Sequence, residues 1–303
     1  MKKFWDTLLI YARPSIALKL DGLERLVIAS KGLPVRLLWH QSLSEALNGL
    51  ELDVDPQFFD SNEPCPEFIQ MRKENTLVLT LGGDGTLLDG IQFAVEWDLP
   101  VFGFHFGRLG FLSSAGGTVD FSAVLTAMLN GQLEIESRSL VACKFPLPMK
   151  GTGMSFALNE MALHRQGAGI MRITCLVNGE LLNNYQADGL LISTPTGSTA
   201  YSMSCGGPIV LPQSKVLLIT PVAGHQLGIR PVLLPDTSRL QLITAAEGGD
   251  AQLMLDGKPI QWAGYGTLEI YRHEKVLALA RLKGFSDLHN LRAKLLWGLD
   301  VRG

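Results

Sequence analysis

A short run of glycines around one carboxylate is the part of this chain best suited to do chemistry. The run reads Leu81-Gly82-Gly83-Asp84-Gly85-Thr86. Glycine lets the backbone bend sharply, and amide N–H groups at the start of a helix can bind a phosphate. A carboxylate repels a phosphate that it merely holds, so Asp84 is better suited to act on a proton or a metal ion beside that phosphate. The same run also fits a tight turn with a solvated aspartate, so it does not decide the function alone.

A second run, over residues 187–208, is rich in glycine and in small hydroxyl side chains. Its centre reads Thr194-Pro195-Thr196-Gly197-Ser198-Thr199-Ala200-Tyr201. A backbone without bulky side chains can approach a ligand closely, and hydroxyl groups can hydrogen-bond a nucleotide. Tyr201 can stack on or border a base. A serine-rich surface loop has the same composition, so this run also needs support from the rest of the chain.

The elements that must position the first run alternate between strand and helix. Residues 75–80 are apolar and β-branched and predict a buried strand, whereas the apolar residues after Thr86 recur at helical spacing. The glycine turn therefore joins a strand to a helix. Alternation of this kind predicts a mostly parallel sheet covered by helices, with ligands bound beyond the carboxyl ends of the strands. The expected strands are 7–12, 35–39, 76–80 and 100–104, and the expected helices are 16–30, 42–50, 86–97 and 120–129.

From about residue 137 the apolar residues alternate with others, which predicts an all-β domain, a sandwich. Asn178-Gly179 and Asp256-Gly257 predict two hairpin turns. A third hairpin is expected between 268–271 and 275–280, around His273-Glu274. Residues 287–299 are helical again and can pack back on the first domain. The expected domains are therefore 1–136 together with 285–303, and 137–284.

The composition excludes several classes of protein. With 303 residues, 47% of them hydrophobic and 18% charged, the chain can build a packed core and is not disordered. A net charge of −3 offers no general attraction to nucleic acid or to anionic membranes. The four cysteines form no CxxC pair, and no apolar run is long enough to span a membrane. Asp6 and Arg13 interrupt the apolar N-terminal segment, which disfavours a signal peptide. We expect a cytoplasmic protein with reduced thiols and no nucleic-acid or membrane partner.

Taken together, the two runs and the segments between them resemble the NAD kinase family. The glycine string alone is shared with diacylglycerol-type lipid kinases and, loosely, with phosphofructokinases, whereas Asn159-Glu160 and the 194–201 run are much more specific. The matching pieces occur in family order between about residues 75 and 285: Gly82–Thr86, Gly107-Arg108-Leu109-Gly110-Phe111-Leu112, Asn159-Glu160, Asp188 to Tyr201 with Gly206-Gly207, His225 with Arg230-Pro231, and Asp256-Gly257.

The resemblance implies an N-terminal Rossmann-like α/β domain, a C-terminal β-sandwich domain and a C-terminal helix that returns to the first domain. It also implies the reaction, which transfers the terminal phosphoryl group of ATP, with Mg²⁺, to the 2′-hydroxyl of the adenosine ribose of NAD to give NADP. The expected partners are NAD and ATP, with polyphosphate as an alternative donor. We also expect a homodimer or homotetramer built through the β-domains, because hairpin edges need covering.

The resemblance also implies a role for each site residue. Asp84 is the proposed base near the ribose hydroxyl, and Asn159 and Glu160 would hold the adenine and ribose side of NAD. Asp188 would contact the nicotinamide end. The glycine loop for the phosphate donor comprises Gly82, Gly83, Gly85 and Thr86; Thr199, Ala200 and Tyr201 would line the adenine pocket, and His225 would lie at the nucleotide. The protein itself is expected to supply no metal site.

One position departs from the family pattern. The family usually has Asn where this chain has His105. A histidine can donate one hydrogen bond and accept another, and it titrates near neutral pH. Both a backbone-satisfied histidine and a ligand contact fit this position. The other histidines (His40, His164, His273 and His289) are expected at the surface or in packing contacts.

Three other functions compete with this interpretation. A lipid kinase needs an apolar acceptor pocket, which the hydroxyl-rich run argues against. A non-catalytic module that senses NAD(H) or NADPH would keep the binding residues but lose Asp84 or its glycines, and all of these are present. A Rossmann dehydrogenase is disfavoured because no Gly-x-Gly-x-x-Gly follows the first strand.

Overall fold

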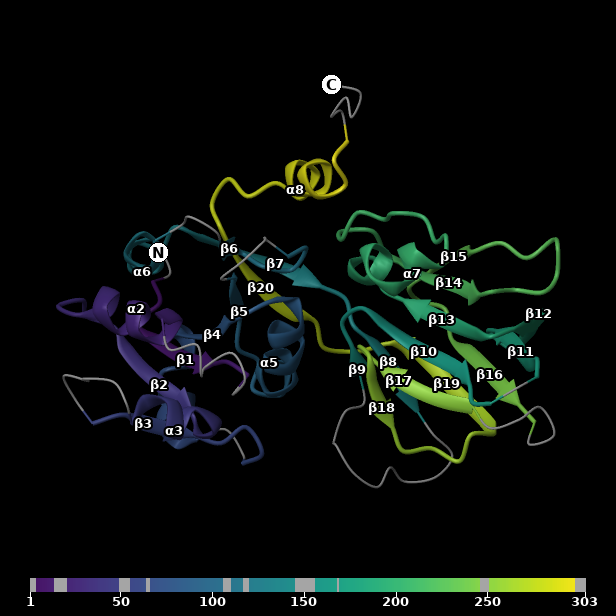
Figure 1. Cartoon of the computed structure of the whole chain (residues 1–303), viewed down its shortest axis with the longest axis horizontal. Coiled ribbons are helices and arrows are strands. Elements are labelled where there is room, and N and C mark those ends of the chain that lie inside the picture. The colour runs from purple at the N-terminus through teal and green to yellow at the C-terminus, as the bar shows by residue number, and fades with distance from the viewer. Residues whose placement is uncertain are drawn as a thin grey trace. The chain divides into compact units, whose positions relative to one another are not determined.

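The structure is a computed structural model that describes residues 4–13, 21–48, 55–63, 66–105, 110–116, 120–144, 156–167, 169–245 and 251–297. The chain forms two compact units (Figure 1). Unit 1 comprises Met1–Ser137 and Leu277–Gly303, and unit 2 comprises Arg138–Val276. Residues 277–297 therefore belong to the same unit as the described residues at the start of the chain.

Unit 1 is built on a sheet of eight described strands. The pairs from β3 to β5 are parallel, and β20 also pairs with β5 in parallel. The strand order is β3 (Gln57–Phe59), β2 (Arg36–His40), β1 (Thr7–Tyr11), β4 (Thr76–Leu81), β5 (Val101–His105), β20 (Leu277–Leu282) and β7 (Leu133–Arg138), with β6 (Ala115–Gly116) beside β5. The four strands expected in this half are confirmed.

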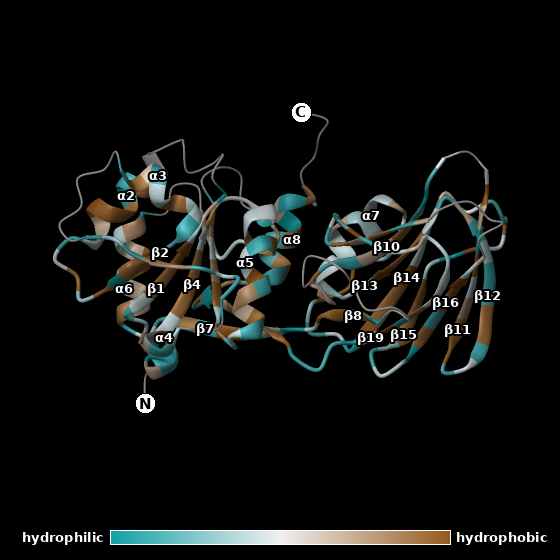
Figure 2. Ribbon diagram, turned by 90° about the horizontal axis from the view of Figure 1, so that it is seen from below, coloured by the Kyte–Doolittle hydropathy of each residue, from teal (hydrophilic) through white to brown (hydrophobic). Residues whose placement is uncertain are grey.

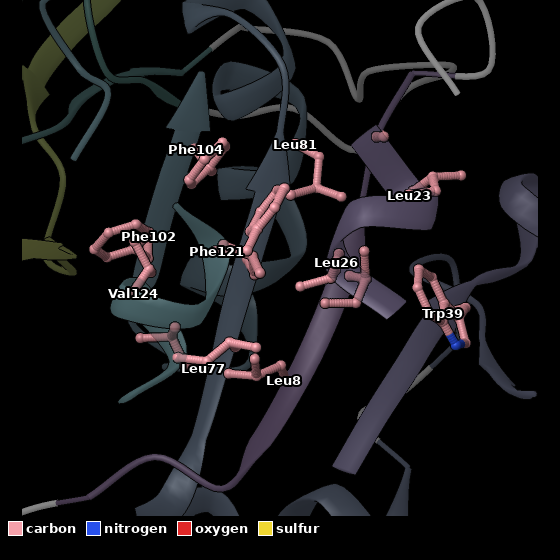
Figure 3. Close-up of a cluster of buried hydrophobic side chains, with 14 of the residues drawn as sticks. Leu8, Leu23, Leu26, Trp39, Leu77, Leu81, Phe102, Phe104, Phe121 and Val124 are labelled. Atoms are coloured by element: carbon pink, nitrogen blue, oxygen red, sulfur yellow. The ribbon is translucent and has the colours of Figure 1, made fainter. Parts of the chain in front are cut away.

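Helices cover both faces of this sheet. On one face, side chains from α2 (Asp21–Ser30) and α6 (Phe121–Leu129) point toward those of β1, β4 and β5 (Figure 3). There the rings of Phe104 and Phe121 stack with centroids 4.0 Å apart. The other face packs against α5 (Asp84–Glu96). The remaining helices of unit 1 are η1 (Gln41–Leu43), α3 (Ser44–Leu47), α4 (Glu67–Met71), η2 (Lys73–Asn75) and α8 (Asp287–Lys294).

The strand β4 and the helix α5 hold the glycine turn between them. All six residues of β4 are buried, as expected for a strand covered on both faces, and the ribbon of β4 is largely hydrophobic (Figure 2). A Cβ atom on Gly90 of α5 would lie 2.7 Å from Cγ2 of Thr80. The absence of a side chain at Gly90 therefore lets the helix lie close against β4, which fixes where α5 begins.

Unit 2 is a sandwich of two antiparallel sheets whose inner faces share one hydrophobic core. One sheet has the order β15 (Val232–Pro235), β14 (Val216–Val222), β13 (Gly189–Ser193), β10 (Glu160–Arg165), β17 (Ala251–Leu255) and β18 (Lys258–Ile260). The other has the order β12 (Glu180–Ala187), β11 (Met171–Val177), β16 (Leu240–Thr244), β19 (Gly266–Arg272), β8 (Val141–Lys144) and β9 (Phe156–Ala157). Two short helices, η3 (Thr196–Thr199) and α7 (Tyr201–Ser204), follow β13.

Two of the expected hairpins are confirmed and the third is wrong. Asn178-Gly179 joins β11 to β12, and Asp256-Gly257 joins β17 to β18; all four of these turn residues have positive φ angles. The segment expected to pair with 268–271 instead forms β20 and joins the sheet of unit 1 beside β5 (Figure 1). An apolar run predicts a strand but does not specify its sheet, and β20, in which adjacent residues such as Leu279, Ala280 and Arg281 are all buried, pairs in parallel with β5.

Candidate functional site

The glycine turn of unit 1 has the geometry of an anion-binding helix start. Gly82 follows β4 with a φ of 149°, and Gly83 is the N-cap of α5 with extended backbone. The amides of Thr86 and Leu87 both donate to the carbonyl oxygen of Gly83. The first amides of a helix have no acceptor within the helix, so those of Asp84 and Gly85 remain for an anion. Thr86, the third residue of α5, is buried.

Asp84, the first residue of α5, holds a second segment of unit 1. Its Oδ2 accepts the amide of Phe111 at 2.9 Å, and its Oδ1 accepts the hydroxyl of Ser113 at 3.1 Å, with the amide of Leu112 at 3.4 Å from the same atom. A Cβ on Gly110 would lie 1.8 Å from Asp84 Oδ1. Glycine at 110 therefore leaves room for the carboxylate. Of the expected segment 107–112, residues Gly107-Arg108-Leu109 lie outside the described residues.

Two cations close to this turn were missed by the sequence interpretation. Arg13, just after β1, donates from Nε to Asp89 of α5 at 2.6 Å and from Nη2 to the carbonyl oxygen of Gly85 at 3.0 Å. Lys294 of α8 lies 4.9 Å from the centre of the Phe111 ring, and its charge interacts with that of Asp84. Burial lowers the pKa of Lys294. A charged residue directly after an apolar strand is a signal that could have identified Arg13.

His105 lies against the same turn. It ends β5, and a Cβ on Gly83 would lie 3.3 Å from His105 Nε2. The histidine ring therefore packs beside the N-cap of α5, where its bulk constrains the turn.

In unit 2, the Asn159-Glu160 pair is held by a buried carboxylate. Asp256 accepts the amides of Leu158 and Asn159, both at 2.7 Å, and that of Glu160 at 3.2 Å. Burial raises the pKa of Asp256 to about 6, against the effect of these three hydrogen bonds. The sequence interpretation used Asp256 only as a turn residue. The structure shows that it also orients the backbone of the Asn-Glu pair.

The hydroxyl-rich run lies against this pair. Thr194 donates its amide to the carbonyl oxygen of Asn159 at 2.9 Å, and its hydroxyl to that of Leu158. A Cβ on Gly197 would lie 2.0 Å from the same Asn159 oxygen. The Asn-Glu pair and the run from Thr194 to Thr199 are thus brought together in unit 2, through contacts that only glycine at 197 permits.

Glu160 is a buried acid that faces this run. Its side chain is 7% exposed, and Oε2 has no hydrogen-bond partner among the described residues. Burial, with the charge of Asp256 nearby, raises the pKa of Glu160 to about 8, while the amide of Tyr201 donates to the carboxylate and opposes the shift. A buried polar atom normally has a partner, so the free oxygen indicates a place for a ligand group.

Tyr201 begins α7 and offers an exposed aromatic ring. Its side chain is 38% exposed and stacks on His164 of β10, with ring centroids 5.4 Å apart and an interplanar angle of 26°. The expected neighbours Thr199 and Ala200 precede it, with the Thr199 hydroxyl donating to the carbonyl oxygen of Thr196. His164 was expected only as a surface or packing residue, and its contact with Tyr201 places it beside the predicted adenine pocket.

Asp188 and His225 are close together in unit 2. Arg165 Nε donates to Asp188 Oδ1 at 2.7 Å, and His225 Nε2 lies 3.7 Å from the same oxygen. The hydrogen bond from Arg165 holds the pKa of Asp188 below its usual value. Because β10 and β13 pair Glu160 with Ser193 and His164 with Gly189, this ion pair lies at the opposite end of the ladder from Glu160.

The described residues contain no group of three His, Cys, Asp or Glu side chains that could hold a metal ion. No helix in the described ranges has the length and apolar character needed to cross a membrane. Three cysteines in these ranges are free thiols, of which Cys143 and Cys175 are buried, and burial raises the pKa of both to about 12. Cys65 lies outside the described residues.

Two family models match the chain. The model described as the ATP-NAD kinase N-terminal domain matches residues 55–133. The model described as the ATP-NAD kinase C-terminal domain matches residues 158–266. The first match contains the glycine turn with Asp84, and the second contains the Asn-Glu pair and the hydroxyl-rich run.

Individual proteins are similar to the chain over most of its length. A protein named NAD kinase from Cytophaga hutchinsonii is 35% identical over 227 residues, which are 75% of this chain and 77% of that protein. The crystal structure of yeast NADH kinase complexed with NADH has a TM-score of 0.79 and 25% identity, covering 99% of this chain and 89% of the yeast chain. An NAD kinase from Archaeoglobus fulgidus, in complex with ATP, shares the fold with a TM-score of 0.68 at 24% identity, covering 96% of this chain and 98% of that one.

Proposed function

The chain belongs to the NAD kinase family, and from this premise we propose which of its residues carry out its reaction. It is an enzyme that transfers the terminal phosphoryl group of ATP to the 2′-hydroxyl of the adenosine ribose of NAD, giving NADP. The diacylglycerol-type lipid kinase, which shares the glycine string, is not favoured.

We assign the proton transfer to Asp84. In the reaction, the ribose O2′ attacks the terminal phosphorus of ATP, the bond from that phosphorus to the bridging oxygen breaks, and ADP leaves. The hydroxyl proton passes to the Asp84 carboxylate. A sugar hydroxyl is a poor nucleophile, and most of the work in phosphoryl transfer is positioning and charge neutralisation. The observation that carries this assignment is the carboxylate at the first residue of α5, fixed by the 111–113 segment beside helix-start amides that have no acceptor among the described residues.

The donor phosphates are assigned to the glycine loop. The amides of Asp84 and Gly85 are the donors that α5 leaves without an acceptor, and Gly82 and Gly83 allow the backbone to approach a phosphate. Lys294 adds a positive charge close to Asp84. Together these groups favour an anion in front of the carboxylate.

Mg²⁺ would bind at this loop together with ATP, with ligands from the phosphates as well as from the protein. The described residues offer no cluster of three candidate ligands, and Mg²⁺ commonly binds through substrate phosphates with one or two carboxylates. Asp84 is the carboxylate that we assign to it. When bound, the ion neutralises the charge that develops on the transferred phosphoryl group.

NAD binding is assigned to unit 2. Asn159 and Glu160 hold the adenosine ribose side, with the partnerless oxygen of Glu160 as the main support. Thr199, Ala200 and Tyr201 line the adenine pocket, where the exposed Tyr201 ring can stack on the base. Asp188 and His225, already neighbours, contact the nicotinamide end.

We also propose that the enzyme is a homodimer or homotetramer built through its β-domains. The strand β12 is an edge of its sheet, and its Leu181 and Leu182 side chains are 55% and 37% exposed. Exposed edges with apolar side chains are usually covered. Sedimentation that shows a fully active monomer at micromolar concentration would remove this claim.

The free thiols favour a cytoplasmic location.

The direct test is incubation of the full chain with ATP, Mg²⁺ and NAD, followed by mass spectrometry. An NADP-specific dehydrogenase then checks that the phosphate is at the 2′ position. NADH as acceptor and inorganic polyphosphate as donor belong in parallel reactions, because they define the substrate range. Phosphorylation of diacylglycerol or sphingosine, with NAD left unchanged, would contradict the assignment.

A further inference from the structure

The strand β20 carries a buried arginine whose hydrogen bonds converge on one short segment of unit 1. Arg281 is 1% exposed. Its Nη1 donates to the carbonyl oxygens of Leu112 at 3.0 Å and Ser113 at 2.6 Å, and its Nη2 donates to that of Phe111 at 3.4 Å. The guanidinium thus donates hydrogen bonds to the carbonyl groups of three consecutive residues. The carboxylate of Glu136 is 3.9 Å from its Nε.

Asp84 binds the same segment through its N–H and O–H donors, whereas Arg281 binds its carbonyl acceptors. The carboxylate accepts the amides of Phe111 and Leu112 and the hydroxyl of Ser113, whereas Arg281 donates to the carbonyl groups of these residues. In the peptide group that joins Phe111 to Leu112, the oxygen faces the cation and the N–H faces the anion. Both charges polarise this peptide group in the same direction, although its two hydrogen bonds are long, at 3.4 Å each. The shorter bonds, from Phe111 N–H to Asp84 and from Arg281 to Leu112 and Ser113, fix the segment.

The guanidinium has little freedom to move. It lies over the ring of Phe285, with 4.1 Å between its carbon and the ring centre. On the next residue of the segment, the amide of Ser114 donates to the carbonyl oxygen of Gly103 at 2.8 Å, and its hydroxyl donates to that of Ala280. The segment is therefore bound to β5 and β20 through Ser114, and to Asp84 through Phe111, Leu112 and Ser113.

We propose that Arg281 is a positioning residue for phosphoryl transfer, because it fixes the 111–113 segment and thereby the direction of the Asp84 carboxylate. This inference rests on the proposed role of Asp84 as the proton acceptor. Arginine suits the task because its planar fork reaches several carbonyl oxygens at once, whereas a lysine ammonium is a single compact charge. Displacement of a catalytic group by about 1 Å can cost about a hundredfold in rate.

The test uses the full chain with Arg281→Lys and Arg281→Met. We expect kcat to fall about tenfold in the first and about a hundredfold in the second, while KM for NAD and for ATP changes less than about twofold. Added guanidinium ion should restore part of the kcat of Arg281→Met. The control is Leu279→Ala, a fully buried residue of the same strand, which should lower the melting temperature and leave kcat unchanged in the folded enzyme.

A double-mutant cycle shows whether Arg281 acts through Asp84. In an Asp84→Asn background, Arg281→Met should cause little further loss of kcat, because the carboxylate that it positions is gone. The proposal would be overturned if the double variant lost kcat by the product of the two single-variant losses. It would also be overturned if Arg281→Lys had a normal kcat. An Arg281→Lys chain that fails to fold where Leu279→Ala folds would overturn it too, because Arg281 would then serve the fold alone. If Asp84→Asn itself leaves kcat unchanged, the role of Asp84 fails, which is a separate outcome.

Discussion

At the scale of single residues, the carboxylate of Asp84 combines two tasks. It accepts hydrogen bonds from the 111–113 segment, and it lies at the start of a helix whose first amides favour an anion. Hydrogen bonds from fixed backbone groups hold a carboxylate in one direction without the entropy cost of ordering mobile side chains. In the mechanism that we propose, the proton transfer and the local structure therefore depend on the same two oxygen atoms of Asp84, and variants must separate the two roles.

Asp84→Asn keeps the size of the side chain but removes its charge and one acceptor. We expect kcat to fall by about two orders of magnitude or more, with little change in NAD affinity, because an amide cannot accept the hydroxyl proton. Calorimetry and steady-state kinetics on the same protein measure the two quantities. Ser113→Ala is the control, since it removes one hydrogen bond to Asp84 and leaves the charge, and it should cost less than about tenfold in kcat. Lost NAD binding with normal kcat at saturation would make Asp84 a binding residue.

Glu160 allows a prediction about stability and pH. Its pKa is raised to about 8 in the folded protein, above its ordinary value of 4.5, so the folded state binds the proton more tightly than the unfolded state. Its contribution to stability is therefore fully present below about pH 4 and is lost as the pH rises through about 8. The raised pKa of Asp256 acts in the same direction at lower pH. These two carboxyl groups should thus lower the free energy of unfolding between about pH 5 and about pH 8, whereas His40 and His164, whose pKa values burial lowers, act in the opposite direction.

Urea denaturation at both ends of this pH range measures the effect. Glu160→Gln cannot ionise, so its unfolding free energy should depend less on pH than that of the unchanged enzyme. Asp188→Asn is a useful comparison, because the pKa of Asp188 is lowered and its removal should not flatten the profile in this range. Equal slopes for the unchanged enzyme and for Glu160→Gln would contradict the assignment of the titrating group.

At the scale of elements, close approaches of backbone determine where the functional groups lie. Gly90 lets α5 lie against β4, Gly110 makes room for the Asp84 carboxylate, and Gly197 lets the hydroxyl-rich run touch Asn159. Each contact joins segments that are far apart in the chain or in different elements. A single methyl group at any of these positions would therefore displace a functional segment.

Gly110→Ala should separate Asp84 from its segment. The added Cβ would lie 1.8 Å from Asp84 Oδ1, so either the segment or the carboxylate must shift. We expect kcat to fall by about tenfold or more, in line with a displaced catalytic group, while calorimetry shows NAD affinity within about twofold of the unchanged enzyme. A variant with normal kcat would show that the turn tolerates the displacement and that its geometry does not limit the rate.

Local patterns in the sequence predicted the strand β4, the glycine turn, the helix α5 and two hairpins, because apolar period and turn chemistry depend on adjacent residues. The family resemblance supplied the predicted site residues, which stay predictions. Neither indicated that β20 belongs to the sheet of unit 1, since a short apolar strand fits either sheet. The partners of Asp84 and the role of Arg281 also escaped prediction, because their contacts span 27 to 170 residues of sequence. A lone arginine inside the apolar strand 277–282 was the available signal.

At the scale of the whole molecule, unit 1 is not continuous in sequence. Its sheet contains strands from the first 138 residues and β20 from residues 277–282, which lies between β5 and β7. Unit 2 is built entirely from the residues in between. The fold of unit 1 therefore depends on a strand that follows the whole of unit 2 in the chain.

A chain that ends at residue 276 should retain a folded unit 2 and lose a folded unit 1. Without β20, the buried faces of β5 and β7 and the carbonyl groups held by Arg281 lose their partners. Limited proteolysis with mass spectrometry should give a protected fragment close to residues 138–276 and rapid cleavage before it. A chain that ends at residue 297 is the control. Protection of residues 1–137 in the shorter chain would contradict this dependence.

The position of β20 also sets the order of events during synthesis. A ribosome releases a chain from its N-terminus, and domains generally fold as units when their residues have emerged. Here the first residues to emerge must wait for β20, which leaves the ribosome after every strand of unit 2. We expect unit 2 to fold first, although unit 1 begins the chain. During that interval the open edge of β5 is exposed to chaperones and to other nascent chains, so we expect the yield of folded enzyme to depend on how soon β20 pairs with β5.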